Sequence, residues 1–140
     1  MRITLGELQS SMSALQELSA LKFPAKVSYR LARVLKSAEA EMGHLRTAHF
    51  ELVQRLGTKA SDSDNFQVLP ENMTQFQLQM TDLLTESAEI WGDPLPIDLL
   101  GDVQIEPSVL ANLDWLVIGP EQTDAPQLLN GKTVGAEAVN

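Results

Sequence analysis

Residues 24–56, PAKVSYRLARVLKSAEAEMGHLRTAHFELVQRL, decide the fold. In this stretch, residues suited to a buried stripe recur in steps of three and four, the period of one face of an α-helix. They are Val27, Leu31, Val34, Ala38, Met42, Leu45, His49, Leu52 and Leu56. Pro24 suits the first turn of such a helix, and Gly57 suits the C′ position just after its end. About 32 helical residues span roughly 48 Å, so the stretch predicts a long helix that projects or acts as a spine.

A shorter helix is predicted in front of the long one. Thr4 and Glu7 have the spacing of a capping box, and apolar residues follow at helical spacing from Leu5 to Leu18. We therefore expect a helix over residues 5–20. Residues 21–23 interrupt the apolar pattern before Pro24, so the two helices are expected to form a hairpin.

Shorter elements are predicted after the long helix. Residues 58–65 are polar and turn-rich, residues 66–69 alternate like a strand, and residues 72–87 have helical spacing with Asn72 as a cap. The runs 88–91 and 95–99 predict strands that pair with residues 66–69 in a small antiparallel sheet, where Pro96 confines its strand to an edge. Pro107 opens a last helix whose apolar residues continue to Val117.

The predicted fold class is therefore mainly α with a small antiparallel β element. It consists of a helical hairpin with one long helix, a third helix, short strands and a short C-terminal helix. The length of 140 residues and the hydrophobic content of 44% suit one domain. We expect residues 1–120 to form a single mainly helical domain and residues 121–140, which have few large apolar groups, to form a flexible tail.

The two parts of the chain carry opposite charge. The net charge is −9, yet residues 1–60 hold nine basic and five acidic residues, whereas residues 61–140 hold 14 acidic residues and Lys132 alone. Such an asymmetry favours either contact between the two parts or a separate partner for each. The sequence has no cysteine, no apolar leader and no run long enough to cross a membrane. We expect a protein of a virion or of the host cytoplasm, without a membrane partner.

Known catalytic patterns are missing from the sequence, so the chain is not expected to be an enzyme or to need a cofactor. It has no cysteine nucleophile, no Gly-x-Ser-x-Gly elbow and no glycine-rich phosphate loop. Glu41 and His44 form one Glu-x-x-His pattern, but a di-metal bundle needs two. His49 lies on the apolar stripe and is expected to be a buried structural histidine. No metal site is predicted.

The clearest candidate for binding is a basic helix face formed by Lys26, Arg30 and Arg33. Their spacings of four and three place them on one side of the long helix, and Lys22 and Lys36 extend the set. Nucleic acid is a poor match, because the acidic part would repel phosphates and few aromatic residues flank these cations.

Two alternatives for this basic face remain open. The first is pairing with carboxylates, within the chain or between subunits, and the candidates are Asp82, Glu86, Asp98 and Asp102. The second is a solvated face with no special role. Among the aromatic residues, Trp115 lies in an amphipathic run and is expected either to pack in the core or to dock onto a neighbouring subunit.

Several landmarks of the chain occur in a fixed order: FPAKVSYRLARVL at residues 23–35, the long helix to Gly57, PEN at residues 70–72 with Phe76, and the segment from Ile105 to Leu116. This ordered pattern over about residues 24–118 resembles small uncharacterised proteins of tailed bacteriophages. The resemblance implies a viral origin and transfers no catalytic residue. It implies a protein of the particle or of the infected cell. We expect a non-enzymatic component of the head, tail or ejection assembly that contacts other copies of itself or other phage structural proteins. The alternative is an acidic phage protein that binds a host protein, inhibiting or modulating it as a nucleic-acid mimic.

Overall fold

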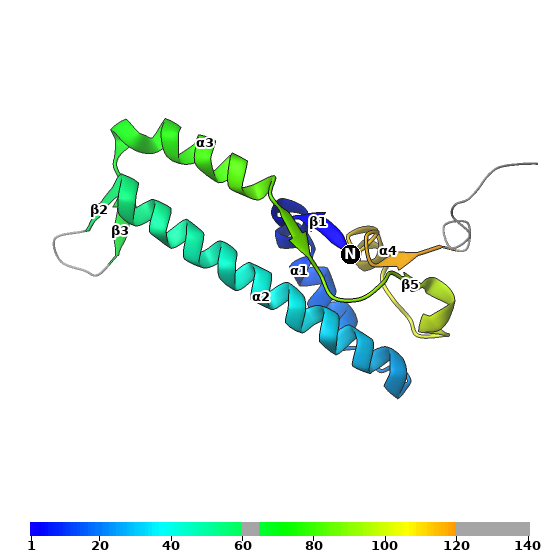
Figure 1. The fold of residues 1–140 in the computed structure, drawn as a ribbon. Helices are drawn as coiled ribbons and strands as arrows, with labels where there is room; N and C mark the ends of the chain where they lie inside the picture. Colours follow the sequence, from blue (N-terminus) through cyan, green and yellow to red (C-terminus); the bar gives the residue numbers. More distant parts are fainter. Residues whose placement is uncertain (60–64, 120–140) are drawn as a thin grey trace, which may run out of the picture.

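The computed structural model describes residues 1–59 and 65–119, and Figure 1 shows their arrangement. The tail predicted for residues 121–140 lies outside the described residues. The described chain is mainly helical with small two-stranded sheets, as the sequence predicts. None of its helices is long and apolar enough to cross a membrane.

The helical hairpin is formed by α1 (Leu5–Ser19) and α2 (Ala25–Leu56), which confirms both predicted helices. The capping box at the start of α1 is also confirmed. The Glu7 backbone N–H donates to the Thr4 hydroxyl at 3.1 Å, and the Thr4 N–H donates to the Glu7 carboxylate at 3.4 Å. Pro24 is the N-cap residue of α2. The capped start fixes where α1 begins and so aligns its apolar face with that of α2.

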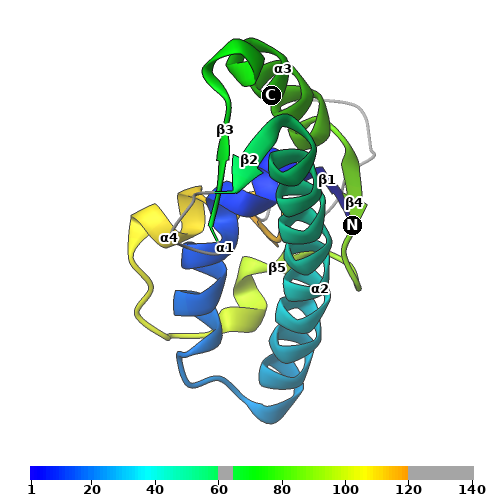
Figure 2. The ribbon, with the colours of Figure 1, turned by 90° about the vertical axis from the view of Figure 1, so that its left-hand side faces the viewer.

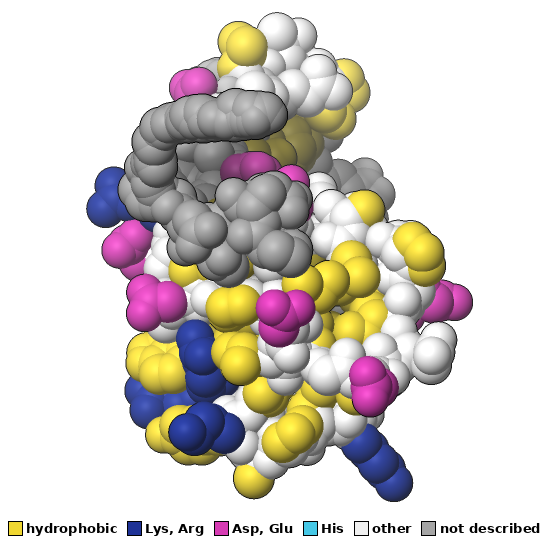
Figure 3. Space-filling model, turned by 90° about the vertical axis from the view of Figure 1, so that its right-hand side faces the viewer, with side chains coloured by type: hydrophobic (Ala, Val, Ile, Leu, Met, Phe, Trp, Pro, Cys, Tyr) yellow, Lys and Arg dark blue, Asp and Glu magenta, His cyan; other side chains and the backbone are white. Residues whose placement is uncertain are grey.

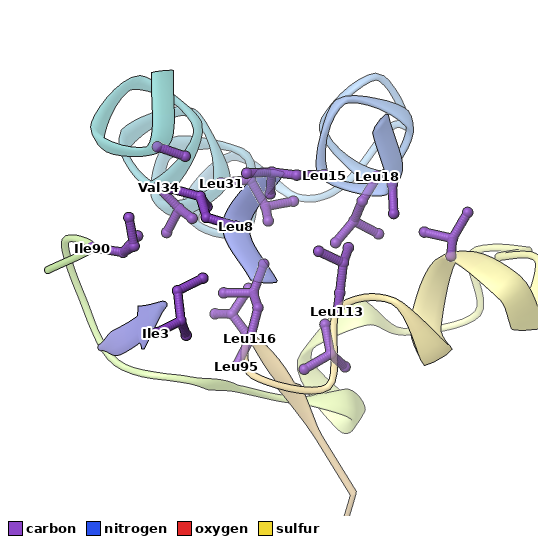
Figure 4. Close-up of a cluster of buried hydrophobic side chains, with 14 of the residues drawn as sticks. Ile3, Leu8, Leu15, Leu18, Leu31, Val34, Ile90, Leu95, Leu113 and Leu116 are labelled. Atoms are coloured by element: carbon purple, nitrogen blue, oxygen red, sulfur yellow. The ribbon is translucent and has the colours of Figure 1, made fainter. Parts of the chain in front are cut away.

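The core lies between the helical hairpin and a second layer made of β1 (Arg2–Thr4), residues 88–95, α4 (Pro107–Ala111) and β6 (Val117–Ile118), as Figure 4 shows. The long helix contributes its stripe as far as Leu45 to this core cluster. Leu52 and Leu56 are buried outside the cluster, towards the C-terminal end of α2. His49 is exposed, so its predicted burial is wrong: nothing in the second layer extends far enough along α2 to cover it, and its ring contacts Phe76 edge-on.

The strands pair differently from the prediction. β1 pairs antiparallel with β4 (Ser87–Glu89), β2 (Gly57–Lys59) pairs antiparallel with β3 (Phe66–Val68), and β5 (Leu95–Pro96) pairs in parallel with β6. The expectation that the runs 88–91 and 95–99 join residues 66–69 is therefore wrong. The length of α2 explains this, because β2 and β3 lie at its C-terminal end while the other strands lie beside the core (Figure 1).

The end of α2 also departs from the prediction. Gly57 has an extended conformation with φ of −122° and begins β2, so it is not a left-handed C′ residue. A Cβ atom at Gly57 would press on the carbonyl oxygens of Gln67 and Val53. Glycine is needed here because β3 passes very close to the helix end. The side-chain amide of Asn72 donates to the Leu56 carbonyl at 2.8 Å and so satisfies one of the last carbonyls of α2.

The third helix is α3 (Met73–Leu84), preceded by the 3-10 turn η1 (Pro70–Asn72). It ends before the predicted residue 87, because residues 87–89 pair with β1. Asn72 is the N-cap residue of α3, as predicted, but its side chain makes no capping hydrogen bond to the helix. No residue of α3 is buried. The helix therefore covers the C-terminal half of α2 only loosely (Figure 1).

The last elements are short. The 3-10 turn η2 (Ile97–Leu100) replaces most of the strand predicted for residues 95–99. Pro107 opens α4 as predicted, but the helix stops at Ala111, and Val117 lies in β6 instead of continuing it. The chain must turn there, because Leu113 and Leu116 both enter the core while the chain continues into the strand.

Gly43 lies inside α2 and Gly57 at its end, and an alanine substitution should have opposite effects on stability at the two positions. At Gly43, inside α2, a Cβ would approach only an Arg46 guanidinium nitrogen at 3.8 Å, so Gly43→Ala should raise the free energy of unfolding by about 1 kcal/mol. Gly57→Ala should lower it by about 1–3 kcal/mol through steric overlap. Urea unfolding followed by circular dichroism measures both. Changes of the same sign at the two positions would contradict this account of α2.

Candidate partner-binding face

The structure places the three predicted basic residues together on one flank of α2. Lys26 and Arg33 are exposed and Arg30 is half-buried, next to the buried stripe that begins at Val27 and Leu31. Burial of this stripe against α1 fixes the rotation of α2 about its axis. The rotation in turn directs the basic flank away from α1. Helix packing therefore positions these cations, without any contact among them.

Two aromatic side chains that the sequence did not single out as part of this site lie against Arg33. Its guanidinium carbon is 4.5 Å from the centre of the Trp91 ring and 5.8 Å from that of Tyr29. Its Nη1 also donates to the Tyr29 hydroxyl at 3.0 Å. Tyr29 is 59% exposed and Trp91 is 37% exposed. Arg33 is thereby held in place by cation–π contacts while the aromatic surfaces stay accessible.

Trp91 belongs to a segment that is fixed at several points. Its backbone N–H donates to the Ser37 hydroxyl at 3.0 Å. Arg30 donates to the Asp93 carbonyl at 3.3 Å, and the amino terminus of Met1 donates to the Ile90 carbonyl at 2.7 Å. These bonds tie residues 90–93 to α2 and to the start of the chain. We define the basic-aromatic face as Lys26, Tyr29, Arg30, Arg33 and Trp91.

No carboxylate within residues 1–59 and 65–119 forms an ion pair with a cation of the basic-aromatic face. Over the same residues, the ion pair found joins Arg2 to Glu89 at 3.1 Å, and both side chains are largely exposed. The predicted pairing with Asp82, Glu86, Asp98 or Asp102 therefore does not form within the described chain. Pairing between subunits stays a prediction.

An acidic surface lies elsewhere on the molecule. Residues 98–114 contain four acidic side chains, all exposed, and no basic one: Asp98, Asp102, Glu106 and Asp114. We call them the acidic segment. α4 packs on α1, and Figure 2 shows α1 between α2 and α4. In Figure 3, most visible Lys and Arg side chains gather at the lower left, beside hydrophobic side chains, while Asp and Glu are spread over the rest of that face. The acidic segment forms no ion pair with the basic-aromatic face in the described chain.

Trp115 takes the first of the two roles considered for it from the sequence, packing in the core, while docking onto a neighbouring subunit stays a prediction. It is half-buried and packs against the core cluster, and its indole N–H donates to the Ser11 hydroxyl at 3.0 Å. Ser11 is 5% exposed and in turn donates to the Glu7 carbonyl at 2.7 Å. The side chain therefore fastens the C-terminal part of the chain to α1.

No candidate metal site is found in the described ranges. No group of three or more His, Asp or Glu residues in this part of the chain could hold a metal ion. Glu41 is half-buried and His44 exposed, on a flank of α2 that carries no second such pair. Comparisons with protein-family models, with curated proteins and with solved structures found no match. Function must therefore be argued from this chain's own surfaces.

The two tryptophans should respond differently to replacement by phenylalanine. Trp115→Phe removes the indole N–H that donates to the buried Ser11 hydroxyl, and it also removes packing volume. This variant should therefore lower the free energy of unfolding by about 1–3 kcal/mol. Trp91→Phe alters an exposed side chain and should change it by about 0.5 kcal/mol or less. Urea unfolding compares the two. A Trp115 variant as stable as the parent would show that this contact contributes little.

Proposed function

We propose that this chain is a non-enzymatic assembly protein of a bacteriophage particle, which binds through its basic-aromatic face to the acidic segment of another copy. One observation carries the proposal: the face holds a fixed Arg33 between two exposed aromatic rings, yet finds no carboxylate partner in the described chain. The ordered resemblance to tailed-phage proteins supports the viral setting.

The composition of the face favours protein binding. Arg, Trp and Tyr are the residues most enriched among those that dominate protein–protein binding energy. Arg33 is already held by Tyr29 and Trp91, so docking costs it little side-chain entropy. The acidic segment offers complementary charge and, at Leu99, a side chain that is 44% exposed. Exposed ion pairs contribute only about 0–1 kcal/mol each. The charges therefore set orientation, while Trp91 and Leu99 supply apolar contact.

The separation of the two surfaces determines the kind of assembly. Within the described chain, the cations of the basic-aromatic face form no ion pair with the acidic segment, so both surfaces stay available to other copies. Different patches that bind one another join copies head to tail, and such contacts build rings or filaments. A repeated particle component needs this kind of contact. The proposed contact joins the basic part of the chain, residues 1–60, to the acidic part, residues 61–140, a division that the net charge of −9 alone does not show.

Neutral variants of each surface test the head-to-tail contact. The first carries Lys26→Gln, Arg30→Gln and Arg33→Gln, and the second carries Asp98→Asn, Asp102→Asn and Glu106→Gln. Each alone should lose self-association by about tenfold or more, as expected from removing three pairs. An equal mixture should regain head-to-tail association, but this contact should not extend beyond one pair of copies, because only one complementary pair of these surfaces survives. Analytical ultracentrifugation at low salt measures this.

A matched control and the viral setting complete the test. Arg55→Gln removes one charge from the far end of α2 and should leave head-to-tail association unchanged.

Mass spectrometry of purified particles should find the chain in stoichiometric amount, and the triple Gln variant should be missing from them. Its unchanged incorporation would contradict the proposal. Absence from particles together with co-purification of one host protein would instead support the acidic modulator.

A further inference from the structure

We infer that a second surface of α2 binds the same helix of another copy in antiparallel orientation, through Glu39, Gly43, Arg46 and Phe50. These residues follow one another at spacings of four, three and four, so they share one face of the helix. This face lies on the other flank of α2 from the basic-aromatic face. The inference is therefore independent of the proposed function.

A groove runs beside this face. It has a volume of about 930 Å³ and lies between α1, α2 and α3. Three methionines line it, one from each helix: Met12, Met42 and Met80. Methionine side chains are flexible and adapt to differently shaped apolar partners. None of the residues of α3 is buried. This helix meets α1 at its C-terminal end, where the Leu84 carbonyl lies beside Gly6, and the groove lies beyond that contact.

Phe50 stands at the edge of the groove with 52% of its surface exposed. Its ring contacts Phe66 edge-on, with the centroids 6.0 Å apart, so it is supported on one side by the β2–β3 hairpin. An aromatic side chain of this size that is half exposed beside an apolar groove is suited to burial against a partner. In a symmetric pair, each copy offers both the aromatic side chain and the groove.

Gly43 indicates a close approach by another chain. Glycine inside a helix is less favourable than alanine, so its position requires a reason. In the described chain, a Cβ there would meet nothing closer than the Arg46 guanidinium at 3.8 Å, which is an ordinary contact. No contact in the described chain therefore requires the glycine. A second helix crossing at Gly43 provides the reason, because a missing side chain lets two backbones approach closely.

The charges on this face favour a second copy of α2 as the partner and favour its antiparallel orientation. Glu39 lies four residues before Gly43 and Arg46 three residues after it, and both side chains are exposed. When two copies of α2 cross antiparallel at Gly43, Glu39 of each lies within one residue's rise of Arg46 in the other. A parallel crossing would place like charges together. A second copy is thus complementary to this face in the antiparallel direction, even though the whole chain carries −9.

The decisive experiment uses charge reversal on a background that removes the head-to-tail contact. All chains carry Lys26→Gln, Arg30→Gln and Arg33→Gln. Glu39→Lys alone should weaken dimerisation at least about tenfold, and Arg46→Glu alone should do the same, because each brings like charges together twice. An equal mixture of the two variants should form the mixed dimer, in which both contacts are again complementary. Native mass spectrometry separates the mixed dimer from either parent.

Further variants check the crossing point and the fold. Glu41→Lys makes the same charge change on a different flank of α2 and should leave dimerisation unchanged. Gly43→Leu should block it, while circular dichroism shows a folded helix, since the nearest atom to an added Cβ in the described chain is an Arg46 guanidinium nitrogen at 3.8 Å. The inference is overturned if the background chain stays monomeric up to about 1 mM, or if the two charge variants fail to form the mixed dimer. The head-to-tail proposal survives either outcome.

Discussion

The burial of one continuous apolar stripe on α2 is the constraint on which the rest of the structure depends. This helix has 32 residues, whereas its hairpin partner α1 has 15. At 1.5 Å per residue the two lengths are roughly 48 and 22 Å. The core cluster therefore ends at Leu45, and the stripe beyond it must be covered by α3 and the β2–β3 hairpin. A helix of 12 residues with no buried side chain gives only partial cover.

The way in which α2 is covered leaves usable surface on both of its flanks. Near its N-terminal end, the second layer of the core fixes residues 90–93 against the helix and so presents Trp91 beside Arg33. Near its middle, the loose placement of α3 leaves the methionine-lined groove open. One flank is basic and aromatic, and the other carries one acidic and one basic residue around Gly43. The two flanks therefore suit different contacts, the first with an acidic surface and the second with its own copy.

Part of the candidate site could be predicted because it depends on helical spacing alone. Lys26, Arg30 and Arg33 share a flank of any helix that contains them, and the buried stripe fixes which way that flank points. Tyr29 stands four residues before Arg33, a spacing that could have indicated their contact. Nothing in the sequence connects Trp91 with Arg33, since they meet only after the chain returns from α3 to the core. His49 was misplaced for the same reason, because periodicity shows a stripe but not where its cover ends.

By itself the sequence determined the local structure: the capping box at Thr4 and Glu7, the length of α2, the start of α4 at Pro107, and the mainly helical class. These features depend on residues a few positions apart, whose interactions are fixed by backbone geometry. Only the tertiary structure decided which strands pair, why Gly57 must be glycine, and that Trp91 lies against Arg33. Those outcomes depend on where distant segments meet, and three-residue strands contain too few side chains to specify their partners in advance.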